Sequence, residues 1–217
     1  FMIANNVSKI TLEMLKEKFE AYQPVDEFIH QKLLSLFFIY LIVGGMPDAV
    51  KSYIATKDIR EVDKVQRDIV ALYKEYFSQY ESEDKKLKLI SIYDIIPAEL
   101  NKQNKKFVFT MLDKELKFDR YENSFLWLKD AGVALPVYNV EAPIIPLKAS
   151  KSSNVFRLFS NDTGLLTSAY PAETKLELIN KNSEVNNGAH FENAVIQQLT
   201  SNGLEPYFCK KKNIGEL

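Results

Sequence analysis

The stretch Phe37-Phe38-Ile39-Tyr40-Leu41-Ile42-Val43-Gly44-Gly45-Met46-Pro47-Asp48-Ala49-Val50 decides how the chain folds. The apolar run at residues 33–43 is shorter than the about 20 residues that a bilayer crossing requires, so it predicts a helix buried in a core. Gly44 and Gly45 can take the positive φ that ends a helix, and Pro47 suits the first position of the next one. The stretch therefore predicts a central helix, a sharp bend and a second helix.

The composition is that of an ordered globular protein. Hydrophobic residues make up 46% of the 217 residues and aromatic residues 12%, which excludes a disordered chain. The net charge of −1 gives no overall electrostatic case for binding nucleic acid or a membrane. Cys209 is the single cysteine, so no internal disulfide can form and a reducing cytoplasm is the expected location.

The first part of the chain predicts a helical bundle over residues 1–84. Apolar residues recur at helical spacing, with a polar cap or a proline at the breaks. The predicted helices cover residues 11–22, 26–43, 47–55 and 58–80. The helix over residues 58–80 has an apolar face, opposite a face of mixed charges that indicates a solvated surface. A charged loop is expected at residues 81–86.

Residues 85–150 predict three short helices followed by a β-ribbon. The helices are expected at residues 87–96, 107–116 and 118–131, with Pro97 stopping the first and Gly132 the third. A strand is expected at residues 133–140, and a short extended piece between Pro143 and Pro146. This order of elements is typical of a winged helix-turn-helix.

The third of these helices would read a DNA groove. It is electrically neutral, because three basic and three acidic residues lie in residues 117–131. Winged helices also serve as joints between proteins, so the two alternatives stay open. The DNA-contact candidates are Lys105, Lys106, Lys117, Arg120, Asn123 and Lys129.

Residues 151–217 predict a small α+β segment. Strands are expected at residues 155–159, 207–210 and near 214, and helices at residues 174–179 and 190–199. Asp162 precedes a short turn that holds Gly164, and its carboxylate suits a helix cap at least as well as chemistry. The chain opens on Phe1-Met2 and stops where a strand begins, so we expect a fragment of a longer protein.

Three motifs together resemble a known family. They are Tyr40-Leu41-x-x-Gly44-Gly45-Met46-Pro47, the run at residues 156–166, and Gly188-Ala189-His190-Phe191-Glu192-Asn193. This order is similar to that of a bacterial and archaeal family of AAA+-type ATPases, which join an N-terminal ATPase core to a C-terminal domain of unassigned function. The resemblance runs from about residue 26 to the chain end. It implies that this chain is the C-terminal portion and that the ATPase core, with its ATP and Mg²⁺, is a partner.

The resemblance also implies a nuclease-like segment at the end of the chain. Members of the family resemble restriction endonucleases here, with a helix glutamate followed by an aspartate strand and a Glu-x-Lys strand around Mg²⁺. Glu192 matches the helix glutamate, and the other two elements would lie beyond residue 217. One carboxylate cannot build the site, so Glu192 is a candidate acid or a structural residue.

The sequence thus predicts a mostly helical α+β chain with segments at residues 1–84, 85–150 and 151–217. No phosphate-binding Gly-x4-Gly-Lys-Ser/Thr pattern occurs, so we expect no ATPase activity in this chain and no metal site of its own.

We expect a non-catalytic interaction or DNA-docking region, without a membrane role; an oligomer is compatible with the sequence. The rival functions are a winged-helix DNA-binding module and a nuclease whose catalytic strands are missing. The structural motif residues are Gly44, Gly45, Met46, Pro47, Asp162, Gly164, Glu192 and Asn193.

Overall fold

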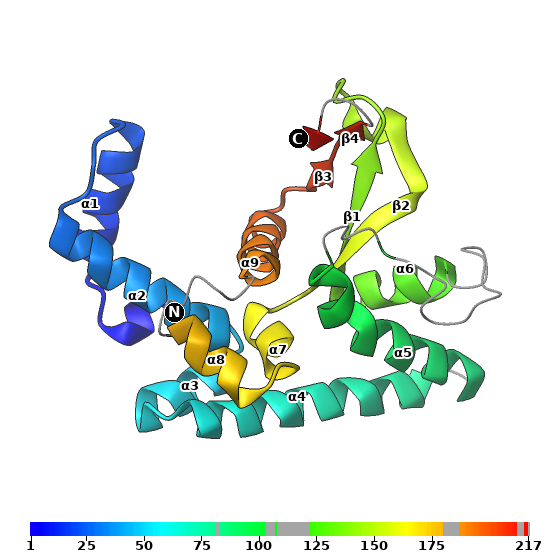
Figure 1. The fold of residues 1–217 in the computed structure, drawn as a ribbon, viewed down its shortest axis with the longest axis horizontal. Helices are drawn as coiled ribbons and strands as arrows, with labels where there is room; N and C mark the ends of the chain where they lie inside the picture. The colour runs from blue at the N-terminus through cyan, green and yellow to red at the C-terminus, as the bar shows by residue number, and fades with distance from the viewer. Residues whose placement is uncertain (81–82, 103–106, 108–121, 180–186, 212–214, 217) are drawn as a thin grey trace. The chain divides into compact units, whose positions relative to one another are not determined.

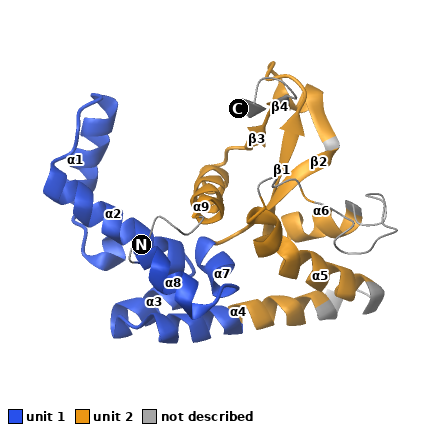
Figure 2. Cartoon of the chain, in the orientation of Figure 1, with its two compact units in different colours: residues 1–68, 163–185 blue, residues 69–162, 186–217 orange. Residues whose placement is uncertain are grey.

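The computed structural model describes residues 1–80, 83–102, 107, 122–179, 187–211 and 215–216 (Figure 1). The fold is mixed α+β and mostly helical, with one three-stranded and one two-stranded sheet among the described residues. The chain forms two compact units (Figure 2): unit 1 is Phe1–Asp68 with Thr163–Val185, and unit 2 is Ile69–Asp162 with Asn186–Leu217. The three-segment division expected from the sequence stays a prediction.

Unit 1 consists of helices whose ends follow local sequence signals. Ser8 caps the first α-helix by accepting from the N–H of Thr11, and Asp26 caps the second by accepting from Phe28 and Ile29. Pro47 begins the third helix, as predicted. The elements are η1 (Ile3–Asn5), α1 (Lys9–Glu20), α2 (Glu27–Val43), α3 (Pro47–Thr56), the first half of α4 (Ile59–Tyr80), α7 (Thr163–Ser168) and α8 (Ala172–Ile179).

The apolar helix α2 is less buried than its sequence predicts. Within unit 1 only its last turn, Leu41, Ile42 and Val43, is fully buried, whereas residues 33–40 are half-buried apart from exposed Ser35. The prediction of a helix buried all round is therefore wrong for most of its length. The core that α2 joins contains Val43, Ala49, Tyr53 and Val62.

Unit 2 combines helices with the sheet. Its elements are the second half of α4, α5 (Glu83–Leu100), α6 (Glu122–Asp130), β1 (Ala134–Val140), η4 (Leu147–Ser150), β2 (Lys151–Ser160), α9 (Gly188–Ser201), β3 (Tyr207–Phe208), β4 (Lys210–Lys211) and β5 (Gly215–Glu216). Gly132 has a φ of 67° and follows α6, which confirms it as the stop of that helix. None of the helices in the described ranges combines the length and apolarity needed to cross a bilayer.

Helix α5 corrects two expectations. It begins at Glu83, inside the stretch expected to be a charged loop, and Pro97 lies within it rather than ending it. A proline inside a helix removes one backbone hydrogen bond and lowers the stability of the helix by about 3 kcal/mol. The helix continues because Ile96 and Leu100, on either side of the proline, are both almost fully buried.

The three-stranded sheet pairs β1 with β2 on one side and β3 on the other, giving the order β2-β1-β3, and β4 pairs with β5 in the two-stranded sheet. β1 and β2 are antiparallel, and β1 and β3 are parallel. The extended piece expected between Pro143 and Pro146 is not a strand; the partner of β1 is the segment that the sequence analysis placed in the nuclease-like part. The predicted boundary at residue 150 thus falls inside one β-hairpin.

The two faces of this sheet carry different neighbours, because side chains alternate along a strand. Phe156 stacks on Phe107 at 5.7 Å and meets Phe125 of α6 edge-on at 4.9 Å. Val137 and Arg157, paired across β1 and β2, face α9 instead. Apart from Phe107, the helix expected at residues 107–116 lies outside the described residues, as does the beginning of the one expected at 118–131. The winged helix therefore stays a prediction.

Candidate functional site

The end of α2 is the first place where the sequence motifs meet. The last four carbonyls of a helix have no partner within it, and here each finds one. Gly44 N–H donates to the Tyr40 carbonyl at 2.8 Å, and the hydroxyl of Thr167 in α7 lies 2.7 Å from the Leu41 carbonyl. The amide of Gln66 in α4 donates to the Ile42 and Val43 carbonyls at 2.7 and 3.1 Å.

Gln66 is a residue that the sequence analysis missed. It is almost fully buried on the apolar face of α4, four residues after Val62, and that polar residue on an apolar face was the signal that could have found it. Phe77, which is fully buried on the same helix, was also missed. Leu72 and Tyr76, which also lie on the apolar face predicted for this helix, are 61% and 44% exposed.

The motif glycines have distinct roles in this arrangement. Gly44 has a φ of 72° and is buried, so the bend after α2 is made there. Gly45 is exposed and is not among the residues with positive φ, so of the two glycines that could take this conformation only Gly44 does. A Cβ on Gly164 would lie 2.5 Å from the Val43 carbonyl oxygen, so only glycine lets α7 approach α2 this closely.

The remaining residues of the first motif join α2 to α3. Met46 is the residue before α3 and packs against the core cluster of unit 1, and Pro47 is the first residue of that helix. The first motif therefore has backbone and packing roles in this structure.

The second and third motifs meet in unit 2. Asn193, fully buried in α9, accepts from the Ser160 N–H at 2.8 Å and donates to the Ser160 carbonyl at 3.2 Å. Asp162, also buried, accepts from the side chain of Gln197 at 3.2 Å. These contacts attach α9 to the end of β2.

Glu192 lies beside a positive charge rather than among carboxylates. Its Oε2 is 3.7 Å from Nη1 of Arg157, whose side chain is 10% exposed, and the guanidinium lies 4.5 Å from the Phe208 ring centre. No group of three histidine, cysteine, aspartate or glutamate residues within metal-binding reach occurs in the part of the chain that the structure describes. The described surroundings of Glu192 therefore do not fit a Mg²⁺ site.

His190 is a buried titratable group that the sequence analysis did not single out. It is 1% exposed in the first turn of α9. Burial lowers its pKa from 6.5 to about 4, because a low-dielectric interior disfavours the charged imidazolium. His190 is thus neutral near pH 7.

The DNA-contact candidates are described only in part. Asn123 and Lys129 are exposed on α6, whereas Lys105, Lys106, Lys117 and Arg120 lie outside the described residues. Lys129 belongs to a basic group that the sequence did not predict. Burial and then the charge of Lys129 lower the pKa of Lys151; Glu205 opposes this by raising the pKa, and Lys148 lowers it further. The Nζ of Lys151 lies 3.6 Å from the Tyr138 ring centre.

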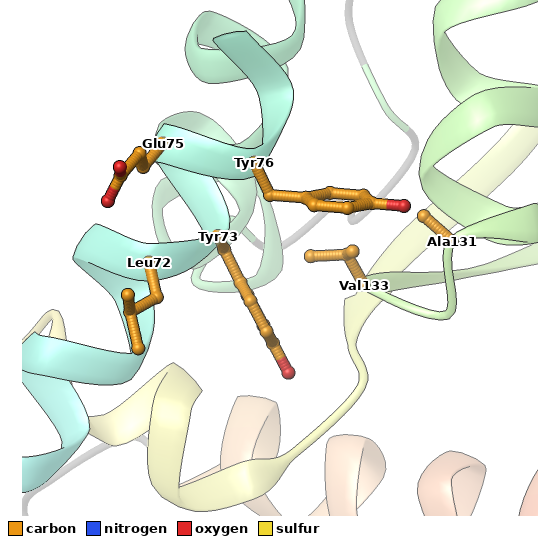
Figure 3. Close-up of a pocket in the computed structure, with 6 residues that line it drawn as sticks. All are labelled: Leu72, Tyr73, Glu75, Tyr76, Ala131 and Val133. Carbon is orange, nitrogen blue, oxygen red and sulfur yellow. The ribbon is translucent and has the colours of Figure 1, made fainter. Parts of the chain in front are cut away.

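A groove on unit 2 lies between α4 and the connection from α6 to β1. Its volume is about 510 Å³, and its lining residues are Leu72, Tyr73, Glu75, Tyr76, Ala131 and Val133. Figure 3 shows the ring of Tyr76 reaching toward Ala131 and Val133, while Glu75 points away. The Tyr76 ring is tilted against Trp127, with the ring centres 5.8 Å apart.

Comparison with protein-family models assigns the chain to a family. A family model described as "Domain of unknown function (DUF8612)" matches residues 34–176, which is more than half of the sequence. The chain belongs to this family. No curated protein and no solved structure matches it.

The DUF8612 match covers most of α2 and extends to α8. It includes the buried end of α2, Gln66 and α7, so the contacts around the α2 carbonyls lie within the family domain. Helix α9, with Glu192 and Asn193, lies after the matched residues.

Proposed function

We propose that this chain is a non-catalytic docking region of an AAA+-type ATP-binding protein, and that it binds the ATPase core of the same protein. The motif residues support a non-catalytic role for the chain, because their described contacts are those of structural residues. Gly44 and Gly164 shape the backbone around α2, and Asn193 ties α9 to β2. Glu192 lies beside Arg157.

The groove of unit 2 supports the proposal that the chain binds the ATPase core. Leu72 and Tyr76 form an apolar wall of the groove. Leu72 is 61% exposed and Tyr76 is 44% exposed. Aromatic anchors in a pocket dominate the energy of many interfaces, and the Tyr76 ring is such a side chain at this groove. We assign an apolar side chain of the ATPase core to this groove.

The test is direct binding between this chain and the separately produced ATPase core. Replacing Leu72 by Asp puts a charge on the groove wall without disturbing a buried residue, and it should weaken binding. A parent protein without an AAA+ core, or a core that does not bind the chain, overturns the proposal.

A second candidate is DNA docking, favoured by the basic group of Lys129, Lys148 and Lys151 in unit 2. Phosphate contacts from lysines supply sequence-independent affinity that falls with salt. Lys148 is partly neutralised, since its Nζ lies 2.8 Å from Glu205. Weak, salt-sensitive binding of duplex DNA is therefore the form that this function would take.

The nuclease alternative requires carboxylates beyond those described around Glu192. It requires a protein that supplies an aspartate strand and a Glu-x-Lys strand in addition to Glu192. We also propose a cytoplasmic location, since the lone Cys209 is buried and free.

A further inference from the structure

Helix α1, its connection to α2 and the beginning of α2 form an arm, residues 9–28, that carries apolar side chains on its surface. The structure describes every residue of this arm, and none of them is buried. Phe19, Tyr22 and Phe28 are 82%, 97% and 79% exposed. Figure 1 shows α1 well apart from α3, α7 and α8 of unit 1, so these helices do not cover it.

The first helix of the arm has the side-chain pattern of a helix that packs against a partner. Leu12, Leu15 and Phe19 recur at intervals of three and four residues, so they share one face of α1. An isolated helix shorter than about 12–15 residues is marginal in water, and α1 has 12 residues. Its stability therefore depends on apolar contacts made by this face.

The charges of α1 complement a second copy of the same helix. Charged residues of alternating sign follow one side of it, at intervals of three and four residues: Lys9, Glu13, Lys16 and Glu20. When two such helices pack antiparallel, Lys9 of each can lie opposite Glu20 of the other, and Glu13 opposite Lys16, so opposite charges meet. Within one copy, Lys16 and Glu20 form only an exposed pair at 3.8 Å, which is worth little.

The exposed aromatic surface of the arm reaches the size of an interface when two copies contribute it. An aromatic side chain carries about 150–250 Å² of surface, so the three exposed rings leave roughly 400–650 Å² uncovered in each copy. Two copies in contact would remove roughly 800–1,300 Å² from water, and a specific interface needs about 1,000 Å². The arm has three basic and five acidic residues, which does not suit nucleic acid or an anionic membrane.

We propose that a second copy of this chain covers the arm, through antiparallel packing of α1 against the same helix of the other copy. In this register Ile10, which is 77% exposed, lies opposite Phe19. The contact is isologous, because both copies use the same surface. The proposal concerns unit 1 alone and is independent of the docking groove and of the basic group, both in unit 2.

Sedimentation equilibrium of the full chain tests this dimer. Wild type should dimerise with a dissociation constant of roughly 1–100 μM. Replacing Phe19 and Phe28 together by Asp should raise this constant at least about tenfold. The matched control is the double replacement Ile145→Asp and Leu176→Asp, at positions 89% and 59% exposed outside the arm. It makes the same change in net charge and should dimerise as wild type.

A charge exchange tests the antiparallel register. Lys16→Glu alone puts two acids opposite each other at two symmetric places and should weaken the dimer at least about threefold at low salt. Adding Glu13→Lys restores opposite charges across the interface and should recover the affinity. A double variant that dimerises no better than Lys16→Glu alone contradicts this register.

Hydrogen exchange locates the interface without any substitution. The amides of α1 should exchange more slowly at a chain concentration above the dissociation constant than below it, whereas those of α9 should not change. A chain that remains monomeric up to about 1 mM overturns the proposal. A dimer that forms equally well in the Phe19→Asp, Phe28→Asp variant also overturns it. If that variant instead loses binding of the ATPase core and wild type is monomeric, the arm belongs to the core and the proposal is likewise overturned.

Discussion

The carboxamide of Asn193 bonds to both backbone groups of Ser160, accepting from the N–H at 2.8 Å and donating to the carbonyl at 3.2 Å. The side chain thereby gives the end of β2 the pair of bonds that a neighbouring strand would supply. Asn193 is fully buried and Ser160 is 3% exposed, so water cannot replace these bonds.

Replacing Asn193 by alanine should destabilise the fold by about 2–4 kcal/mol, because two buried backbone groups lose their partners. Urea unfolding followed by circular dichroism measures the change. Asn202→Ala is the control: its amide bonds to Gln198 at the exposed end of the same helix. A similar small loss in both variants would show that the Asn193 contact is not a main support of the fold.

The bend after α2 predicts different costs at two neighbouring glycines. Gly44→Ala should lose about 1–3 kcal/mol of stability, since an alanine at a φ of 72° is strained. Gly45→Ala, at an exposed position, should change stability by less than about 0.5 kcal/mol. Equal melting temperatures for the two variants would contradict the assignment of the bend to Gly44.

Much of the fold could be predicted because its signals are local. Asp26 and Pro47 mark the beginnings of α2 and α3, and Gly132 marks the end of α6, each through a backbone requirement of its own. α8 and α9 followed from helical spacing of apolar residues.

The rest depends on contacts between distant segments. Pro97 stays helical because residues on both sides of it are buried, which no local rule reveals. The half-exposure of α2 and the pairing of β1 with β2 are likewise decided by what packs nearby. At the candidate sites, Glu192 was identified from its motif. Its neighbour Arg157, 35 residues earlier, lies in the second motif but was not identified as a site residue.

The buried imidazole of His190 predicts a pH dependence of stability. Its pKa falls from 6.5 to about 4 on folding, so the unfolded chain takes up a proton between these values and the folded one does not. Stability should be full above pH 6.5 and fall by about 3 kcal/mol as the pH drops to 4. His190→Gln should reduce this slope in urea unfolding across that range, whereas substitution of exposed His30 should not.

The basic group of unit 2 predicts how DNA binding responds to salt. If Lys129 and Lys151 contact phosphates, replacing both by alanine should flatten the log–log salt dependence of duplex affinity by about 1.8, or 0.9 per contact. Fluorescence anisotropy of a labelled duplex measures the slope. The exposed Lys9 and Lys32 of unit 1, replaced together, give the same change in net charge and should leave the slope unaltered. If the chain does not bind duplex DNA even near 50 mM salt, the DNA-docking function is contradicted.

The docking proposal is tested most directly by the affinity of the ATPase core for three forms of this chain. Leu72 and Leu176 are matched in type and exposure, at 61% and 59%, but only Leu72 lines the groove. Calorimetry should show that the core binds wild type and Leu176→Asp equally, and Leu72→Asp at least about tenfold more weakly. A core that binds all three forms alike, or none of them, would contradict docking through this groove.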